Sequence, residues 1–392
     1  MRIDFSPPDI RAEDIAAVVR VLESGWITTG PVTRDFEEAL ATFCGTSQVI
    51  AMSSCTAALE QALRISGVGP GDEVVVPAYT YSASAAVVHH VGADLVIVDS
   101  ESGGYVPSPE RIAAAVTSKT KAVIVVDVGG IAYPADLLRD ELEGCGRGSS
   151  VTATRPVVIV DGAHSLGATH RGFSAGQLGD FTCFSFHAVK NLTTGEGGAL
   201  TWRSTLVDDH EELATTLRRM ILHGQSKDAL AKSRAGSWEY DILELGHKEN
   251  MPDILAALGL SQLARYEASM LRRHEILEQY EAGLGHLLAF ARHRGVDQRS
   301  SAHLALSTII NSGFPRDELI RLLAERGVAT NVHYKPLPML AAYGRLGHSP
   351  SNFPNAMAQY EKEITLPLHT LLAEDDVNFV VDSVSEIVIG LQ

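Results

Sequence analysis

VVIVDGAH (residues 157–164) and DFTCFSFHAVKNLTTGEGGALTW (residues 180–202) are the two stretches that decide the fold of this chain. The first is an apolar, β-branched run that ends on Asp161. The second carries an apolar and aromatic run into Lys190 and then into a Gly-rich turn. Apolar runs without polar alternation are typical of strands buried on both faces of a parallel sheet. Ligands bind at the carboxyl ends of such strands, so Asp161 is expected at a binding edge.

Similar apolar runs alternate with helix-like segments over residues 45–205. Strand-like runs occur at residues 73–76, 94–98, 122–126 and 156–160. Between them, residues 56–65 and 108–116 have helical spacing, and the second opens with Ser108 as an N-cap and Pro109 in the first turn. This alternation predicts a doubly wound α/β domain.

The pattern changes near residue 251. A long helical pattern covers residues 253–284, followed by a helix-like segment at 316–327 and an extended one at 328–338. We therefore expect a large α/β domain over residues 1–250, and a connecting helix with a smaller α+β domain over residues 251–392. Residues 141–156 are expected to form an exposed loop.

Composition excludes several classes of function. The 392 residues are 45% hydrophobic and 20% charged, which is typical of a soluble protein, and the net charge of −16 disfavours nucleic acid and anionic membranes as partners. No signal peptide and no apolar run long enough to span a membrane are expected. The four cysteines have neither zinc-ligand nor disulfide-framework spacing, which favours a cytoplasmic protein without a metal.

Lys190 lies between an aromatic run and a Gly-rich turn, which is an unusual place for a lysine because most lysines lie on solvated faces. Burial would lower its pKa and leave a neutral amine that can attack an aldehyde. With Asp161 upstream at a strand end, this suggests pyridoxal phosphate (PLP): the carboxylate keeps the pyridine nitrogen protonated and the lysine forms the Schiff base. The rival nucleotide motifs, G-x-x-x-x-G-K-[ST] and G-x-G-x-x-G, are absent from the sequence.

Two further stretches could complete a PLP site. SSCTAAL (residues 53–59) opens a helix, and its first residues, including Ser54, could bind a phosphate at the helix N-terminus, although simple capping by Ser54 explains the stretch equally well. Tyr79 and Tyr81 follow a strand end. Either could stack on the cofactor ring, or both could belong to the core.

An ordered series of motifs resembles the DegT/StrS-type sugar aminotransferases, a branch of the fold-type I PLP enzymes. These motifs are ESGWITTGP (23–31), SSCTAAL (53–59), GDEVVVPAYTY (71–81), VDGAHSLGA (160–168), FSFHAVKNLTTGEGGA (184–199), LHG (222–224), NMPDILAALGLSQL (250–263) and HYKPLP (333–338). The resemblance runs from about residue 3 to the C-terminus. It implies a fold-type I architecture, PLP as cofactor and a homodimer with shared active sites.

The resemblance also implies a role for each matching residue. Lys190 matches the Schiff-base lysine, Asp161 the partner of the pyridine nitrogen, His164 the side chain beside the ring and Tyr81 the aromatic that stacks on it. Cys55, Thr56 and Ser185 match the phosphate contacts, and Asn250 matches an asparagine that reaches the phosphate from the other subunit. Trp26, Thr28, Thr29, Gly30, His333 and Tyr334 match the substrate side.

The resemblance implies transfer of an amino group from L-glutamate to a nucleotide-linked keto-sugar, giving an amino-sugar for cell-surface polysaccharide. The motifs look most like those of the aminotransferases that make UDP-4-amino-4-deoxy-L-arabinose, so a UDP-linked 4-keto-sugar is expected. Alternatives are a dTDP- or GDP-linked 4-keto-6-deoxy hexose, or a 3-keto sugar. The sequence departs from the family at Cys55, which replaces a glycine, at GHKEN (246–250) and at Asp127, where the family carries histidine.

Three other readings are possible. Dehydratase-type relatives carry histidine at the lysine position, so Lys190 argues against that activity. A catalytically silent homologue would be expected to lose Lys190, Asp161 or the phosphate site. A nucleotide-binding oxidoreductase would need the dinucleotide fingerprint that is missing here.

Overall fold

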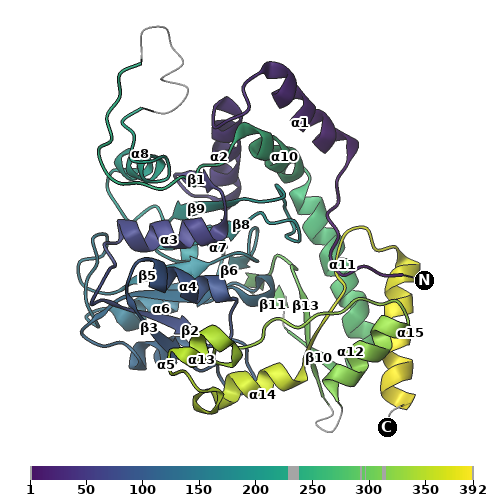
Figure 1. The fold of residues 1–392 in the computed structure, drawn as a ribbon. Coiled ribbons are helices and arrows are strands. Elements are labelled where there is room, and N and C mark those ends of the chain that lie inside the picture. Colours follow the sequence, from purple (N-terminus) through teal and green to yellow (C-terminus); the bar gives the residue numbers. More distant parts are fainter. Residues whose placement is uncertain (1, 228–237, 292–293, 296, 311–314, 391–392) are drawn as a thin grey trace.

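A seven-stranded sheet contains the strands formed by residues 157–161, 181–185 and 198–202 (Figure 1). The computed structural model describes residues 2–227, 238–291, 294–295, 297–310 and 315–390. The strand order is β1 (Val49–Met52), β9 (Gly198–Trp202), β8 (Phe181–Ser185), β5 (Val157–Asp161), β4 (Thr120–Val126), β2 (Glu73–Pro77) and β3 (Asp94–Val98). Strands from β8 to β3 pair in parallel, and β9 runs antiparallel to β8 and β1. The predicted strands and the mostly parallel sheet are confirmed.

Helices cover both faces of this sheet, because successive side chains of a buried strand point in opposite directions. Val74 and Val76 pack in one core cluster with α3 (Cys55–Ile65) and α4 (Ser82–His90). Val75 packs on the opposite face with α5 (Pro109–Ala114) and α6 (Ala135–Leu142). The doubly wound prediction is therefore confirmed. Ser108 caps α5 as expected, since its side chain accepts the backbone N–H of Arg111.

The helical pattern predicted over residues 253–284 is interrupted. It forms two helices, α10 (Asp253–Leu263) and α11 (Tyr266–Leu284), with Arg265 between them at φ −115° and ψ 8°. The Arg265 guanidinium bonds both carboxylate oxygens of Asp14 on α1 (Ala12–Ser24), at 2.7 and 2.6 Å. The break lets α10 pack on α1 and α2 (Pro31–Cys44), while α11 runs toward the C-terminal part of the chain (Figure 1).

A second core forms around a small antiparallel sheet of β10 (Leu288–Phe290), β13 (Ala305–Ile309) and β14 (Glu363–Leu366). It is covered by α11, α12 (Arg316–Glu325) and α15 (Glu374–Gly390). Ile3 is buried in this core and pairs with Val328, so the two ends of the chain lie on the same side of the molecule (Figure 1). The division at residue 250 stays a prediction.

The other elements are short or peripheral. They are β6 (Thr169–His170), β7 (Phe173–Ser174), α7 (Ala175–Leu178), α8 (His210–Met220), β11 (Arg294–Gly295), β12 (Gln298–Arg299), α13 (Ala341–Arg345), α14 (Pro354–Lys362) and the 3-10 turns η1 (Val128–Gly130), η2 (Leu337–Met339) and η3 (Pro350–Asn352). The predicted loop at 141–156 has no regular element after α6 ends. Across the part of the chain that the structure describes, no helix is long and apolar enough to cross a membrane.

Candidate active site

A cavity of about 540 Å³ opens at the carboxyl ends of the parallel strands, beside Lys190. The sequence-predicted residues that line it are Ser54, Cys55, Thr56, Tyr81, Asp161, His164, Ser185, Lys190, His333 and Tyr334. They come from both the sheet domain and the C-terminal part of the chain. The fold therefore gathers ten of the predicted residues, which are spread over nearly 300 positions of the sequence, around one space.

Lys190 lies in the turn between β8 and β9, where its backbone N–H donates to the carbonyl of His187. Burial lowers the pKa of its amine to about 8, and the negative charge of Asp161 acts in the opposite direction. A lysine with this pKa is neutral in an appreciable fraction of molecules near neutral pH, so it can act as a nucleophile or a base.

Asp161 ends β5 and is 5% exposed. Ser84 Oγ donates to one carboxylate oxygen at 2.6 Å, and the other accepts the backbone N–H of Ala163 at 3.2 Å and the thiol of Cys55 at 3.6 Å. Burial holds the pKa of Cys55 well above its usual value, so its thiol stays protonated and can donate. These donors fix the orientation of a carboxylate that faces the cavity.

The phosphate-site prediction rests on the start of α3. Ser54 caps this helix, accepting the backbone N–H of Ala57 at 3.0 Å, while Cys55 and Thr56 in the first turn line the cavity. A Cβ on Gly198 would lie 2.3 Å from the backbone nitrogen of Cys55, so glycine is needed for β9 to pass this close. The helix N-terminus at the cavity wall favours an anion.

His164 is held in one tautomer by its partners. The backbone N–H of Gly129 donates to Nδ1 at 3.2 Å, so the proton lies on Nε2, which contacts the Tyr334 hydroxyl at 2.8 Å. Burial, with the positive charge of Lys190 adding to it, lowers the pKa of His164 well below its usual value. The His303 ring lies 4.3 Å from the His164 ring, centroid to centroid.

The structure separates the two tyrosines, of which the resemblance favours Tyr81. Tyr79 is fully buried in a core cluster, whereas Tyr81 is 62% exposed and lines the cavity, 5.8 Å from the Tyr334 ring. Only Tyr81 of the pair is in a position to meet a ligand.

Five predicted residues do not line this cavity: Trp26, Thr28, Thr29, Gly30 and Asn250. They lie together instead. Asn250 donates to Thr29 Oγ1 at 2.5 Å, Trp26 Nε1 donates to the Thr29 carbonyl at 3.3 Å, and the Gly30 N–H donates to Asp253 at 2.8 Å. The predicted interface residue and the predicted sugar loop are thus one cluster outside the Lys190 cavity of their own chain.

Several lining residues were missed by sequence reasoning. They are Phe5, Ser6, Ala83, Val126, Ala163, His187, Val189, Glu196, Gly197, His303, Leu304, Asn331 and Val332. His187 and Glu196 belong to the motifs around Lys190, and that proximity could have indicated them. Phe5 and His303 carry no local signal, because only the fold brings them to the cavity.

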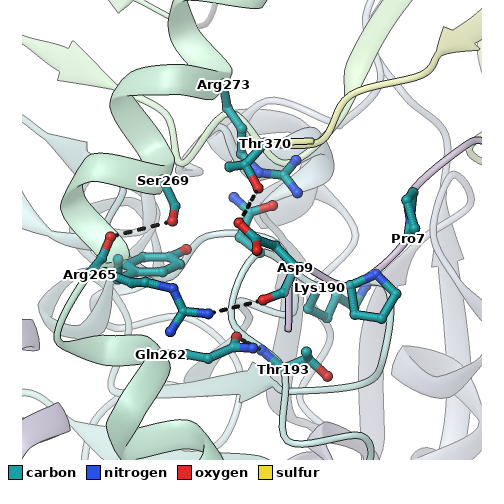
Figure 2. A pocket seen from close by; sticks show the side chains of 12 residues that line it. Pro7, Asp9, Lys190, Thr193, Gln262, Arg265, Ser269, Arg273 and Thr370 are labelled. Carbon is teal, nitrogen blue, oxygen red and sulfur yellow. Dashed lines mark hydrogen bonds between the residues drawn. The ribbon is translucent and has the colours of Figure 1, made fainter. Parts of the chain in front are cut away.

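A second, much smaller cavity lies behind Lys190, between the N-terminal segment and the start of α11 (Figure 2). Arg265 donates to the carbonyl of Asp9, and Thr370 donates to the Asp9 carboxylate, both at 2.9 Å. Arg273 projects into the same region (Figure 2). The volume of about 20 Å³ is that of about one water molecule, so this space packs the back of the site.

Outside both cavities, Glu60, His247 and Glu249 each place one nitrogen or oxygen atom that could bind a metal within 4.8 Å of the others. The guanidinium of Arg64 already donates two hydrogen bonds to Glu60, at 2.9 and 2.7 Å. A metal ion would have to compete with that positive charge, so we still expect no metal site here.

Comparison with known proteins agrees with this geometry. Residues 8–385 match the DegT/DnrJ/EryC1/StrS aminotransferase family. The chain belongs to this family. The spore coat polysaccharide biosynthesis protein SpsC of Bacillus subtilis is 38% identical over 397 aligned residues, covering 99% of this chain and 97% of SpsC.

Solved structures of aminotransferases superpose closely on this chain. The putative sugar aminotransferase Spr1654 of Streptococcus pneumoniae, in its PMP form, has a TM-score of 0.95 and 43% identity, with both chains covered completely. Helicobacter pylori PseC, an aminotransferase of pseudoaminic acid biosynthesis, has a TM-score of 0.85 and 26% identity, with 98% of this chain and 99% of PseC covered. The chain is a sugar aminotransferase of the PLP-dependent fold-type I class.

The residues present fit PLP. A buried carboxylate, a lysine of lowered pKa and a helix N-terminus lie around one cavity, and they supply a partner for the ring nitrogen, for the aldehyde and for the phosphate. The Asp161 carboxylate needs no further internal donor, because Ser84 and Cys55 hold it while it faces the cavity.

Proposed function

We propose that this enzyme transfers the amino group of L-glutamate to a nucleotide-linked keto-sugar, with a UDP-linked 4-keto-sugar as the preferred acceptor. The observation that carries the proposal is the single cavity in which Lys190 and Asp161 lie together with polar side chains from both parts of the chain. Its volume leaves room for a sugar beside the cofactor, and the family membership supports a sugar as the substrate.

In this proposal PLP, when bound, supplies an electron sink for the carbon that loses its proton. Lys190 holds the cofactor and then, as a free amine, carries the proton between the donor carbon and the cofactor. Asp161 keeps the ring nitrogen protonated, and its own orientation is fixed by Ser84. His164 and Tyr81 confine the ring, while Cys55, Thr56 and Ser185 hold the phosphate.

The lining of the cavity supports a sugar as one of the substrates. Serine, threonine, tyrosine, asparagine and histidine side chains line it. Neutral donors and acceptors of this kind suit the hydroxyl groups of a sugar ring.

We also propose that the active site is shared between two subunits. Asn250 and the loop around Thr29 are fixed together outside the cavity of their own chain. Three apolar side chains are exposed to solvent: Ile15 and Leu22 of α1 are more than half exposed, and Leu245 is 98% exposed. A second copy that covered these side chains could bring Asn250 and the 26–30 loop to the neighbouring Lys190 cavity.

We also propose that the enzyme acts in the cytoplasm. All four cysteines are free thiols, which suits a reducing compartment, and nucleotide-sugars are expected there as activated intermediates.

The test is a panel of enzymatically prepared nucleotide keto-sugars, each incubated with the PLP-loaded enzyme and glutamate. We expect an amino-sugar from the UDP-linked 4-keto-sugar and one equivalent of 2-oxoglutarate, both measured by mass spectrometry. Amination of only a dTDP- or GDP-linked sugar would overturn the nucleotide assignment, and amination at another ring carbon would overturn the 4-keto assignment. The Lys190→Ala variant is the control for uncatalysed turnover.

A further inference from the structure

His333, at the wall of the Lys190 cavity, is held from behind by two residues of β14. The Glu363 carboxylate accepts the backbone N–H of His333 at 2.9 Å and the hydroxyl of Thr365 at 2.5 Å. The Thr365 hydroxyl in turn lies 2.9 Å from Nδ1 of the His333 ring. Residues two apart on a strand point to the same face, which is why both side chains reach one histidine. Glu363, Thr365 and His333 thus form a chain of hydrogen bonds that ends at the cavity.

Glu363 is an unusual residue for this position, because it is fully buried. No arginine or lysine side chain among the described residues bonds its carboxylate; the Arg316 guanidinium donates to its backbone carbonyl at 3.1 Å. Burial raises the pKa of Glu363 to about 8, against the opposing charge of Arg316. Tyr79, Tyr105 and Tyr334 are the other titratable groups close enough to interact with it. Glu363 can therefore gain or lose a proton at mildly alkaline pH.

The His333 ring, by contrast, stays neutral. Burial lowers its pKa to about 3, with the positive charge of Lys190 adding to the effect, and His164 and His303 are the other titratable rings near it. A neutral imidazole carries one N–H, on either Nδ1 or Nε2, and the partner of one nitrogen decides the state of the other. Nδ1 bonds Thr365, and Nε2 has no hydrogen-bond partner in the described part of the chain. Nε2 is thus available to a ligand.

The single proton of the Thr365 hydroxyl links the two ends of the chain. When Glu363 is ionised it can only accept, so Thr365 donates to it and His333 must donate from Nδ1, which leaves Nε2 as an acceptor. When Glu363 is protonated it donates to Thr365, whose hydroxyl then donates to Nδ1. The histidine proton lies on Nε2 in that state. The ring carries one proton in both states, on Nε2 or on Nδ1, and the chain of hydrogen bonds as a whole releases one proton to solvent when Glu363 ionises.

We propose that Glu363 and Thr365 are positioning residues that set which ring nitrogen of His333 carries its proton, and so decide whether His333 meets the substrate as a hydrogen-bond donor or an acceptor. The inference rests on the proposed function in one respect, that the substrate lies against His333.

Near neutral pH His333 is a hydrogen-bond donor from Nε2, and the neighbouring Tyr334 hydroxyl is a donor as well. His164 donates from Nε2 to the Tyr334 oxygen, so the Tyr334 hydroxyl proton is free to point toward the ligand. Two adjacent donors, His333 Nε2 and Tyr334 OH, then face the cavity without a net charge. They select an oxygen acceptor: a ring or hydroxyl oxygen of the sugar, or the carboxylate of the amino donor.

Glu363→Gln is the decisive variant, because a carboxamide keeps the size and fixes the donor state. Its carbonyl can accept the His333 N–H while its amide donates to Thr365, as the protonated carboxyl does. Thr365→Val breaks the chain at similar volume, and Thr365→Ser preserves it. Glu361→Gln, two residues away on the exposed surface, is the matched control for charge.

The first measurement is made without substrate. Ring 15N signals distinguish the two neutral tautomers, and loss of a signal in His333→Asn identifies His333. We expect the wild-type ring to change from Nε2–H to Nδ1–H as pH rises through the pKa of Glu363, and Glu363→Gln to stay Nε2–H throughout. A tautomer that is the same in both proteins at every pH would overturn the proposal.

The second measurement follows the two half-reactions separately by absorbance. For the half-reaction whose substrate contacts His333, the wild-type KM should rise about 3- to 10-fold as Glu363 ionises, which is the range expected for one hydrogen bond. Glu363→Gln should keep the low-pH KM, Thr365→Ser and Glu361→Gln should behave as wild type, and Thr365→Val should lose the pH step. The saturated rate should stay within about twofold, since Lys190 is untouched.

The two half-reactions also identify the ligand. A KM effect confined to the sugar assigns the acceptor oxygen to the sugar, and one confined to glutamate assigns it to the donor carboxylate. If the pH step in KM seen with the wild type also occurs in Glu363→Gln, Glu363 does not set the tautomer of His333 and the proposal is overturned. If no keto-sugar is aminated by the wild type, the proposed function fails, while the 15N measurement still decides whether Glu363 controls His333.

Discussion

At the scale of single residues, burial and charge act in opposite directions on Lys190. Removal from water disfavours the ammonium, while the Asp161 carboxylate favours it, and burial has the larger effect. The amine is therefore reactive without being permanently neutral. This balance leads to the first prediction.

We expect the cofactor-free enzyme to capture PLP faster as pH rises toward about 8 and to level off above it, because only the neutral amine attacks an aldehyde. With a pKa of about 8, roughly a tenth of the amine is neutral at pH 7, compared with well under a thousandth for an ordinary lysine. Stopped-flow absorbance gives the rate, and borohydride reduction with peptide mapping gives the site. A label on another lysine, such as the exposed Lys335, or a rate that still climbs far above pH 8, would contradict the assignment.

Asp161 and Ser84 are expected to differ in how strongly they affect turnover. Asp161→Asn removes the charge that keeps the ring nitrogen protonated, so turnover should fall by about 100-fold, consistent with ~3 kcal/mol for a charge-assisted hydrogen bond. Ser84→Ala removes one of the three donors to the carboxylate, so a fall of about 10-fold is expected with the fold intact. Steady-state rates on PLP-replete protein, with circular dichroism as the check on folding, decide this. Equal losses in the two variants would show that Ser84 does more than orient Asp161.

At the scale of elements, α11 connects the C-terminal core to the back of the active site through Arg273. This side chain is 5% exposed, and its guanidinium donates to the carbonyls of Leu368, His303 and Ala302 at 2.9, 3.4 and 3.5 Å. Burial lowers the pKa of Arg273 to about 10. The helix thereby fixes the backbone of His303, whose ring packs on His164.

Arg273→Met is expected to destabilise the protein by about 1–3 kcal/mol, because three buried carbonyl oxygens lose their donor while some desolvation cost is relieved. Arg272→Met, one residue earlier and more exposed, should cost less than about 1 kcal/mol. Urea unfolding of both variants tests the difference. If Arg273→Met is as stable as wild type, α11 does not depend on this contact, and the bond from His303 to Asn191 at 2.8 Å contributes more than Arg273 does.

At the scale of the whole molecule, the separation of the Asn250 cluster from the Lys190 cavity predicts complementation between subunits. Lys190→Ala and Asn250→Ala should each be inactive or nearly so as homodimers. In a hybrid dimer, one of the two sites combines an intact Lys190 with an intact Asn250 of the partner subunit. After random exchange, activity should recover to about a quarter of the wild-type value.

Subunit exchange must be demonstrated independently, for example by mass spectrometry of dimers that carry two different tags. No recovery despite proven exchange would show that each site is built from one chain. A protein that remains monomeric while active would contradict the shared site and the cover proposed for Ile15, Leu22 and Leu245.

The sequence by itself determined the features that depend on neighbouring residues. Apolar runs predicted β2, β3, β4 and β5, the cap at Ser54 was readable from its position before a helical stretch, and Lys190 stood out from its motif. These features follow from local preferences, since strand alternation, helix capping and the chemistry of a short motif act over a few residues.

Only the tertiary structure decided which distant side chains meet. Ser84 reaches Asp161 from 77 positions away, and the break between α10 and α11 occurs at Arg265, which bonds Asp14 251 positions earlier. Glu363 and Thr365 meet His333 because β14 lies against residue 331, where the two backbones exchange hydrogen bonds at 3.1 and 2.9 Å. Such contacts leave no periodicity in the sequence. Their energies come from partners that come together only when the sheet, its crossover helices and the C-terminal core have packed.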